Sequence, residues 1–232
     1  MKFVRGTDYQ LGDKYKMDVY KLSALCTTRD TQRAGAEVVK QVATPKMSGL
    51  LYPILQALDE QYLEVDAQFG GVDQRKIFVF AREFLPKIGY KKRVHLLNPL
   101  IPGLGESGKM SSSEPNSKID LTDSDDEIKR KIKKAFSKDG EVLGNGLLAI
   151  AKHIIFFILE YENRKFDIRR PEKYGGNISF SSYIELENAF KEKKLSSIDL
   201  KEALGTEIIG FLGPIRKALE AHQSLLKEAY PD

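Results

Sequence analysis

Residues 63–97 constrain the fold more than any other part of the sequence, because strand and helix patterns alternate there. Residues 63–69 alternate apolar and polar side chains, as a half-buried strand does, and run into Gly70-Gly71. A helical pattern follows over about residues 74–88, and residues 93–97 form a second strand pattern. Two strands joined by a helix favour a parallel α/β sheet, in which ligands bind beyond the carboxyl ends of the strands.

After Gly103 the pattern changes to a loop of small and polar residues, which includes residues 109–114. From Ser124 onwards the chain reads as helical, and Ser124 with Glu127 forms a capping-box pair at the first helix. We therefore expect two domains, an α/β domain over residues 1–121 and an all-helical domain over residues 122–232.

The composition argues against several classes of protein. The chain has 232 residues, and 41% of them are hydrophobic, which is enough to bury a core. No apolar run reaches the roughly 18 residues of a membrane helix, and the N-terminus shows no secretory pattern. The net charge of +4 permits a nucleic-acid partner without requiring one. One cysteine and three scattered histidines argue against disulfides and a protein metal site, so we expect a soluble protein of a reducing compartment.

Three polar residues share a face of the helix predicted over about residues 47–62. Tyr52, Gln56 and Asp59 stand at i, i+4 and i+7, so a phenol, an amide and a carboxylate converge there. Such a face can hydrogen-bond a small polar ligand. The alternative is an amphipathic helix whose polar face meets solvent.

Two further motifs can carry phosphate or nucleotide chemistry. Gly70 and Gly71, followed by Asp73, lie where a strand leads into a helix, so a ligand can approach the backbone there; the alternative is a tight turn with Asp73 as a helix cap. The loop Lys109–Ser113 offers an ammonium and three hydroxyls that can close over a polyphosphate, or it is a solvated serine-rich loop.

Other charged and reactive residues have plainer interpretations. The basic run Lys129–Lys134 can contact phosphates or direct nuclear import, but its helical spacing favours a solvated helix face. We interpret His95, His153, His222 and Cys26 as structural.

Taken together, these motifs resemble tyrosyl-tRNA synthetases of the archaeal and eukaryotic cytoplasmic type, from about Lys2 to the C-terminus. The resemblance implies a cytoplasmic ligase with a partial Rossmann-like class I catalytic domain followed by an all-α anticodon-binding domain. It also implies ATP, with Mg²⁺ bound to it, and L-tyrosine and tRNA-Tyr as partners. The segments that carry it are residues 3–11, 49–59, 65–76 and 109–113.

The resemblance assigns roles to individual residues. Asp59 would bind the phenolic hydroxyl of tyrosine, while Tyr52, Gln56 and Gln74 would hold its amino and carboxyl groups. Gly70 and Asp73 would lie against the adenosine ribose. The ATP phosphates would be held by the loop that resembles the second class I signature, with Ser112 where many members carry lysine. Its residues are Lys109, Met110, Ser111, Ser112 and Ser113, of which Lys109, Ser111 and Ser113 would be catalytic.

In the helical part, Tyr174 matches an aromatic residue that stacks on the first anticodon base, and Asp199 a carboxylate that reads the guanine edge. Ser196 stands where some archaeal members have histidine. Residues from about Phe3 to Lys40 resemble the insertion that forms the homodimer interface of the family.

One departure from the family is large: the strand–helix portion with the histidine-containing first signature is not in this sequence. We therefore expect a truncated or split tyrosine–tRNA ligase, which by itself dimerises but makes no tyrosyl adenylate. The alternative is a non-catalytic module for tRNA binding or dimerisation, derived from such an enzyme.

Overall fold

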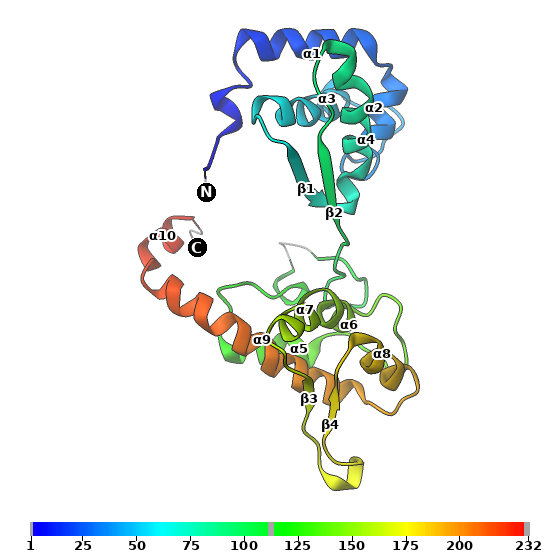
Figure 1. Cartoon of the computed structure of the whole chain (residues 1–232), viewed down its shortest axis with the longest axis vertical. Coiled ribbons are helices and arrows are strands. Elements are labelled where there is room, and N and C mark those ends of the chain that lie inside the picture. Colours follow the sequence, from blue (N-terminus) through cyan, green and yellow to red (C-terminus); the bar gives the residue numbers. More distant parts are fainter. Residues whose placement is uncertain (1, 111–113, 230–232) are drawn as a thin grey trace. The chain divides into compact units, whose positions relative to one another are not determined.

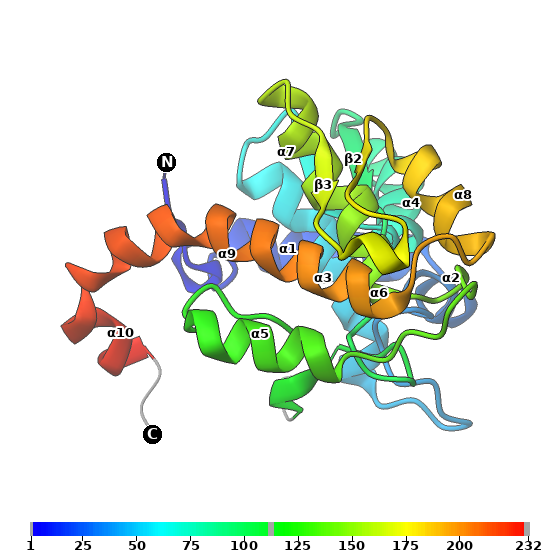
Figure 2. The ribbon, with the colours of Figure 1, turned by 90° about the horizontal axis from the view of Figure 1, so that it is seen from below.

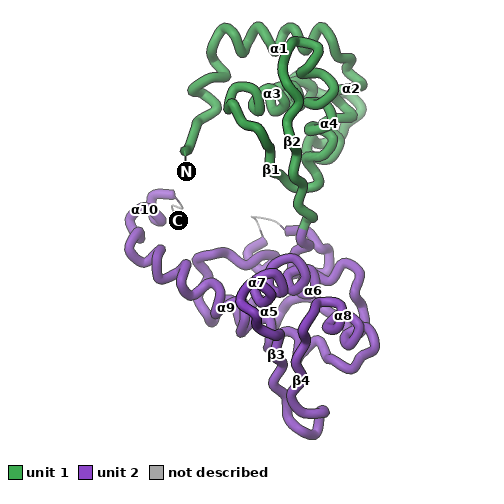
Figure 3. Tube along the Cα trace, viewed as in Figure 1, with its two compact units in different colours: residues 1–100 green, residues 101–232 purple. Residues whose placement is uncertain are grey.

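The computed structural model describes residues 2–110 and 114–229 and divides into two compact units, residues 1–100 and residues 101–232 (Figure 3). The first unit is an α/β arrangement of four helices and a two-stranded sheet (Figure 1). In chain order its elements are α1 (Asp13–Leu25), α2 (Thr28–Ala34), α3 (Met47–Tyr62), β1 (Ala67–Gly71), α4 (Arg75–Phe84) and β2 (Val94–Asn98).

The predicted parallel sheet is confirmed, because β1 pairs with β2 in parallel and Gly71 lies opposite Asn98. The first strand begins later than predicted. Helix α3 ends at Tyr62, and Glu64 adopts a left-handed conformation with φ of 54°, so the chain turns before it extends at Ala67. The polar–apolar alternation over residues 63–66 therefore belongs to a turn.

The core of the first unit lies between α1, α3 and α4, where Tyr15, Leu22, Leu58 and Phe80 are buried. The two faces of the β1–β2 sheet differ in how far they are buried. His95 of β2 packs against α3 and α4, while its strand neighbours Val94 and Leu96 are more than half exposed. Parallel sheets are usually covered on both faces, so this apolar face is an unusual surface.

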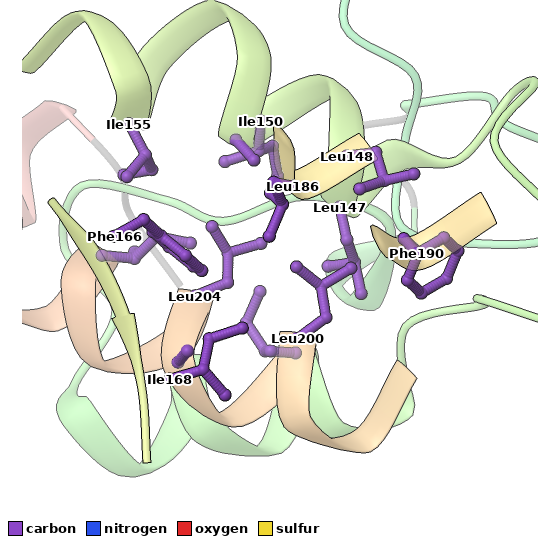
Figure 4. Packing of buried hydrophobic residues seen from close by; sticks show 14 of the residues in the cluster. Leu147, Leu148, Ile150, Ile155, Phe166, Ile168, Leu186, Phe190, Leu200 and Leu204 are labelled. Atoms are coloured by element: carbon purple, nitrogen blue, oxygen red, sulfur yellow. The ribbon is translucent and has the colours of Figure 1, made fainter. Parts of the chain in front are cut away.

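The second unit is largely helical and has a core of its own (Figure 4). Helix α9 packs along α5, and Figure 2 shows these two helices side by side. Residues Ala151–Ile155 form a π-helical turn between α6 and α7. The helices are α5 (Asp125–Lys134), α6 (Gly146–Ile150), α7 (Phe156–Tyr161), α8 (Tyr183–Lys191), α9 (Ser197–Glu220) and α10 (Gln223–Ala229).

The expectation that this part is all-helical is wrong. Strands β3 (Phe166–Ile168) and β4 (Ile178–Phe180) form an antiparallel pair. Both ends of β3 are buried and its middle residue is exposed, so the strand has the two-residue period of a half-buried sheet. A strand of three residues is too short for this period to stand out in the sequence.

The boundary between the units also lies earlier than the predicted one at residues 121 and 122. Leu104 is buried in the core of the second unit, and its backbone bonds to Ser117 and Phe136. A Cβ at Gly146 would lie 2.6 Å from the carbonyl oxygen of Gly103, so the chain approaches α6 closely there. Residues 101–121 therefore fold with the second unit, although their composition resembles a linker.

The capping box at α5 is confirmed, because the Ser124 hydroxyl accepts from the Glu127 amide and the Glu127 carboxylate accepts from the Ser124 amide. The basic run of this helix is not uniformly solvated. Lys131 is buried, and its ammonium lies 2.6 Å from the Asp123 carboxylate. Within the described residues, no helix is both long enough and apolar enough to cross a membrane.

Candidate functional site

Helix α3 presents Tyr52, Gln56 and Asp59 as the helical spacing predicted. Tyr52 is 45% exposed, and Gln56 and Asp59 are half-buried. The Nε2 atom of Gln56 donates to Oε1 of Gln74 over 2.9 Å. The structure thus brings together two of the four residues predicted to bind tyrosine, although 18 positions separate them.

The Gln56 side chain also carries an unused acceptor. Its Oε1 atom is buried and has no hydrogen-bond partner in the described part of the chain. Leaving such an acceptor unsatisfied typically costs about 1–3 kcal/mol. A ligand that brings an ammonium or another N–H donor to this face would remove that cost.

Asp59 has neighbours that the sequence did not indicate. Oδ1 of its carboxylate accepts from Nε2 of Gln10 over 2.9 Å and from the Tyr15 hydroxyl over 3.1 Å. Burial, together with the charge of Asp59, raises the pKa of Tyr9 to about 12. These residues precede Asp59 by more than forty positions, so no local periodicity links them to it.

The two glycines of the strand-to-helix turn are closely surrounded by side chains. A Cβ at Gly70 would lie 3.1 Å from the Phe78 ring, and one at Gly71 would overlap Oδ1 of Asp73. Asp73 lies inside the one-turn 3-10 helix Val72–Gln74 and accepts from Nε2 of Gln74 over 2.8 Å. The start of α4 has no side-chain cap, so the alternative interpretation of Asp73 as a helix cap is wrong.

A buried pair, Glu60 and His95, lies next to Phe78, the ring that faces Gly70 of this turn. Nε2 of His95 lies 3.1 Å from both carboxylate oxygens of Glu60, and the His95 ring stacks on Phe78 at 4.5 Å. Burial raises the pKa of the Glu60 carboxyl above its usual value, and the hydrogen bond and charge of His95 offset only part of that effect. His95 is thus structural, as predicted, and it fixes the ring against which Gly70 packs.

Lys109 lies at the end of a loop that folds back on itself. The Gly103 amide donates to the Gly108 carbonyl over 2.8 Å, and a Cβ at Gly103 would overlap the Lys109 carbonyl. The Lys109 amide donates to the Ser107 hydroxyl over 3.3 Å, and the side chains of Lys109 and Met110 are exposed. The predicted residues Ser111, Ser112 and Ser113 lie outside the described residues.

In the second unit, Tyr174 and Asp199 are linked through a residue that the sequence did not indicate. Tyr174 is 61% exposed in the 3-10 turn Glu172–Tyr174, and Asp199 lies in the first turn of α9. The Arg170 guanidinium donates to the carbonyls of Gly176 and Lys194, over 2.7 and 3.0 Å, and lies 3.9 Å from the Asp199 carboxylate.

Ser196 has a local structural role beside Asp199. Its hydroxyl oxygen accepts from the Asp199 amide over 3.1 Å, and its O–H group donates to the Asp199 carboxylate over 2.9 Å. Ser196 therefore caps α9 and fixes the orientation of the carboxylate. Among the residues that the structure describes, no group of three or more His, Cys, Asp or Glu side chains could hold a metal ion.

Comparison with known proteins places these features in a family. The model of the tRNA synthetases class I (W and Y) matches residues 1–213. The cytoplasmic tyrosine–tRNA ligase of Saccharomyces cerevisiae is 51% identical over 238 residues, covering 100% of this chain and 60% of its own length. The chain therefore spans less than two thirds of the length of that relative.

Solved structures of tyrosyl-tRNA synthetases complexed with L-tyrosine share the fold. That of Archaeoglobus fulgidus matches with a TM-score of 0.82 at 39% identity, over 94% of this chain and 66% of that one. That of Pyrococcus horikoshii matches with a TM-score of 0.86 at 30% identity, over 98% and 68%. By its sequence and its fold, the chain belongs to the class I tRNA synthetases of the tryptophan and tyrosine family.

Proposed function

We propose that this chain belongs to a tyrosine–tRNA ligase, which activates tyrosine with ATP and transfers it to tRNA-Tyr in the cytoplasm. The observation that carries the proposal is the polar face of α3. Gln56 and Gln74 are joined there, a buried acceptor is unused, and Asp59 offers a carboxylate on the same face. This face suits an amino acid whose side chain carries a hydroxyl group, and the two matched archaeal structures are complexes with L-tyrosine.

In this proposal, the Asp59 carboxylate accepts a hydrogen bond from the phenolic hydroxyl of tyrosine, and Tyr52, Gln56 and Gln74 hold the amino and carboxyl groups. Gly70 and Asp73 lie against the ribose of ATP. A carboxylate oxygen of tyrosine attacks the α-phosphorus, the bond to the β-phosphate breaks, and pyrophosphate leaves. The protein supplies positioning and charge stabilisation instead of a nucleophile of its own.

The loop around Lys109 supplies the charge in this scheme. Lys109, whose side chain is exposed, would counter the negative charge on the pyrophosphate that leaves, together with Ser111 and Ser113. Mg²⁺ would enter with ATP as part of the substrate, and the proposal assigns it no protein ligands. The adenylate then loses its tyrosyl group to a hydroxyl at the 3′ end of tRNA-Tyr, and AMP leaves.

Pyrophosphate exchange tests this function. The protein expressed from its complete natural gene should incorporate labelled pyrophosphate into ATP when both ATP and tyrosine are present, and should charge tRNA-Tyr. Tryptophan serves as the control, because the family includes enzymes for both amino acids. Exchange that depends on tryptophan, or no exchange with any amino acid, would contradict the proposal. The second outcome would favour the non-catalytic alternative.

We also propose that the chain forms a homodimer through its first forty residues. The described residues of this segment include six exposed large apolar side chains, 40–86% exposed: Phe3, Val4, Leu11, Met17, Tyr20 and Leu25. Apolar side chains gathered in one segment are typical of interfaces between protein chains. Light scattering on the preparation used for pyrophosphate exchange should accordingly give twice the mass of the monomer.

For the second unit we propose anticodon binding, through Tyr174 and Asp199 with Ser196 beside them. Arg170 bonds to Gly176, just after Tyr174, and lies 3.9 Å from the Asp199 carboxylate, and the Tyr174 ring is 61% exposed. An exposed aromatic ring can stack on a base, and the Asp199 carboxylate can accept from the guanine edge.

Two substitutions separate these roles. Tyr174→Ala should weaken tRNA binding by about 1–3 kcal/mol whatever the first anticodon base, since stacking is insensitive to sequence. Asp199→Asn should remove about 1–3 kcal/mol of the preference for guanine, since an amide cannot accept both guanine protons. Filter binding of tRNA-Tyr and an anticodon-changed tRNA measures both. Tyr161→Ala is the control because Tyr161 is 90% exposed in the same unit. Undiminished guanine preference in Asp199→Asn would rule out the assigned contact.

A further inference from the structure

Asp59 is held by two side chains from the N-terminal part of the chain. Gln10 and Tyr15 both donate to the same oxygen, Oδ1, over 2.9 and 3.1 Å. An isolated carboxylate rotates about its bond to Cβ and offers both oxygens in many directions. Two donors that converge on one oxygen fix the plane of the carboxylate, and with it the direction of the remaining acceptor positions.

Tyr15 is the more rigid of the two donors. It lies on α1, is 1% exposed, and is enclosed by the core between α1 and α3. Its ring is 5.7 Å from that of Tyr9 and 4.8 Å from that of Tyr62, measured between centroids. The position of its hydroxyl is therefore set by helix packing.

The single proton of the Tyr15 hydroxyl has two acceptors within reach. The Leu55 carbonyl lies at 2.9 Å and Oδ1 of Asp59 at 3.1 Å. Burial and the charge of Asp59 raise the pKa of Tyr15, so the phenol keeps its proton at physiological pH and stays a donor. A carboxylate is the stronger acceptor of the two, so the bond to Asp59 gains most from that proton.

We propose that Tyr15 is a positioning residue for tyrosine specificity, which orients the Asp59 carboxylate so that its remaining acceptor positions meet the phenol of the substrate. The inference rests on the proposed function, in which Asp59 binds that phenol. A polar site that is held in place before the substrate arrives favours the substrate that completes its hydrogen bonds, and disfavours one that cannot.

The test compares Tyr15→Phe with Tyr62→Phe in the protein expressed from its complete natural gene. Both changes remove a phenolic oxygen from the same aromatic cluster, but the Tyr62 hydroxyl donates to Asp18 and not to Asp59. Tyrosine-dependent and phenylalanine-dependent pyrophosphate exchange are measured for each. Tyr15→Phe should lower kcat/KM for tyrosine about tenfold and leave that for phenylalanine unchanged, as for a lost hydrogen bond to a charged group. Tyr62→Phe should leave the ratio of the two values unchanged.

A double-mutant cycle separates positioning from a general effect on folding. In an Asp59→Asn background, Tyr15→Phe should cause no further loss for tyrosine, because the oriented carboxylate is already gone. An equal loss in both backgrounds, or equal losses for both amino acids, would overturn the inference. If Tyr15→Phe does not fold, Gln10→Met removes the other donor from a half-buried position, and the same cycle applies.

The cycle also separates this inference from the proposed function. Asp59→Asn without any effect on tyrosine preference would contradict the role of Asp59, and the role of Tyr15 with it. If Asp59→Asn strongly lowers the preference for tyrosine while Tyr15→Phe and Gln10→Met both keep it, only the positioning role would be overturned.

Discussion

Asp59→Ala should lose most of the preference for tyrosine over phenylalanine in pyrophosphate exchange. A site built to bond a hydroxyl is left with an unpaired polar group when phenylalanine enters, so removing the carboxylate removes the penalty. Tyrosyl-tRNA synthetases are the documented case of this effect, with rejection of phenylalanine by roughly 10⁵-fold. The quantity to measure is the ratio of kcat/KM for the two amino acids.

A matched control for Asp59 lies close by in the sequence. Asp66 is an exposed carboxylate whose partner is Lys91, so Asp66→Ala removes a charge of the same kind from the surface. This variant should keep the tyrosine preference. A preference that survives in Asp59→Ala would show that the phenol binds elsewhere, and the tyrosine site would then have to be reassigned.

Lys109→Ala should slow adenylate formation by about 10²–10³-fold while tyrosine binding changes little. Negative charge builds up on the phosphates as the pyrophosphate leaves, and removing one stabilising donor typically costs a factor of this size. We assign Lys109 to the transition state because the charge that it would stabilise develops only as the bond to the β-phosphate breaks. Single-turnover adenylate formation and equilibrium tyrosine binding are the two measurements.

Two variants make this result interpretable. Lys109→Arg keeps the charge and should recover part of the rate. Lys138→Ala removes another exposed lysine of the same unit, which pairs with Glu141, and should leave the rate unchanged. Weakened tyrosine binding at an unaltered rate would mean that Lys109 acts on the ground state instead of the transition state.

Local patterns predicted the secondary structure of the candidate tyrosine site well. The helical spacing of Tyr52, Gln56 and Asp59 and the parallel strands around Gly70 are both present in the structure. Each depends on residues only a few positions apart, because side-chain direction repeats every 3.6 residues in a helix and every two in a strand. The roles of these residues came from the family resemblance, since spacing alone left a solvated helix face open.

Local patterns could not predict contacts between residues that lie far apart in the sequence. The bonds from Gln10 and Tyr15 to Asp59 span 49 and 44 positions, and the Glu60–His95 pair spans 35. Such pairs form only after α1, α3 and the sheet have packed, so no period in the sequence marks them. The same holds for Arg170, which donates to the carbonyl of Lys194, 24 positions later in the chain.

Local sequence patterns were enough to predict the order helix, strand, helix, strand over residues 47–98, the capping box at α5 and the family to which the chain belongs. The tertiary structure decided which polar groups are buried and with whom, as Lys131 shows: it reads as part of a solvated basic face, yet Asp123 makes its burial possible. It also assigned residues 101–121 to the second unit through Leu104. The physical reason is that propensity and periodicity act between near neighbours, whereas burying a charge requires an opposite charge that only the folded chain brings within reach.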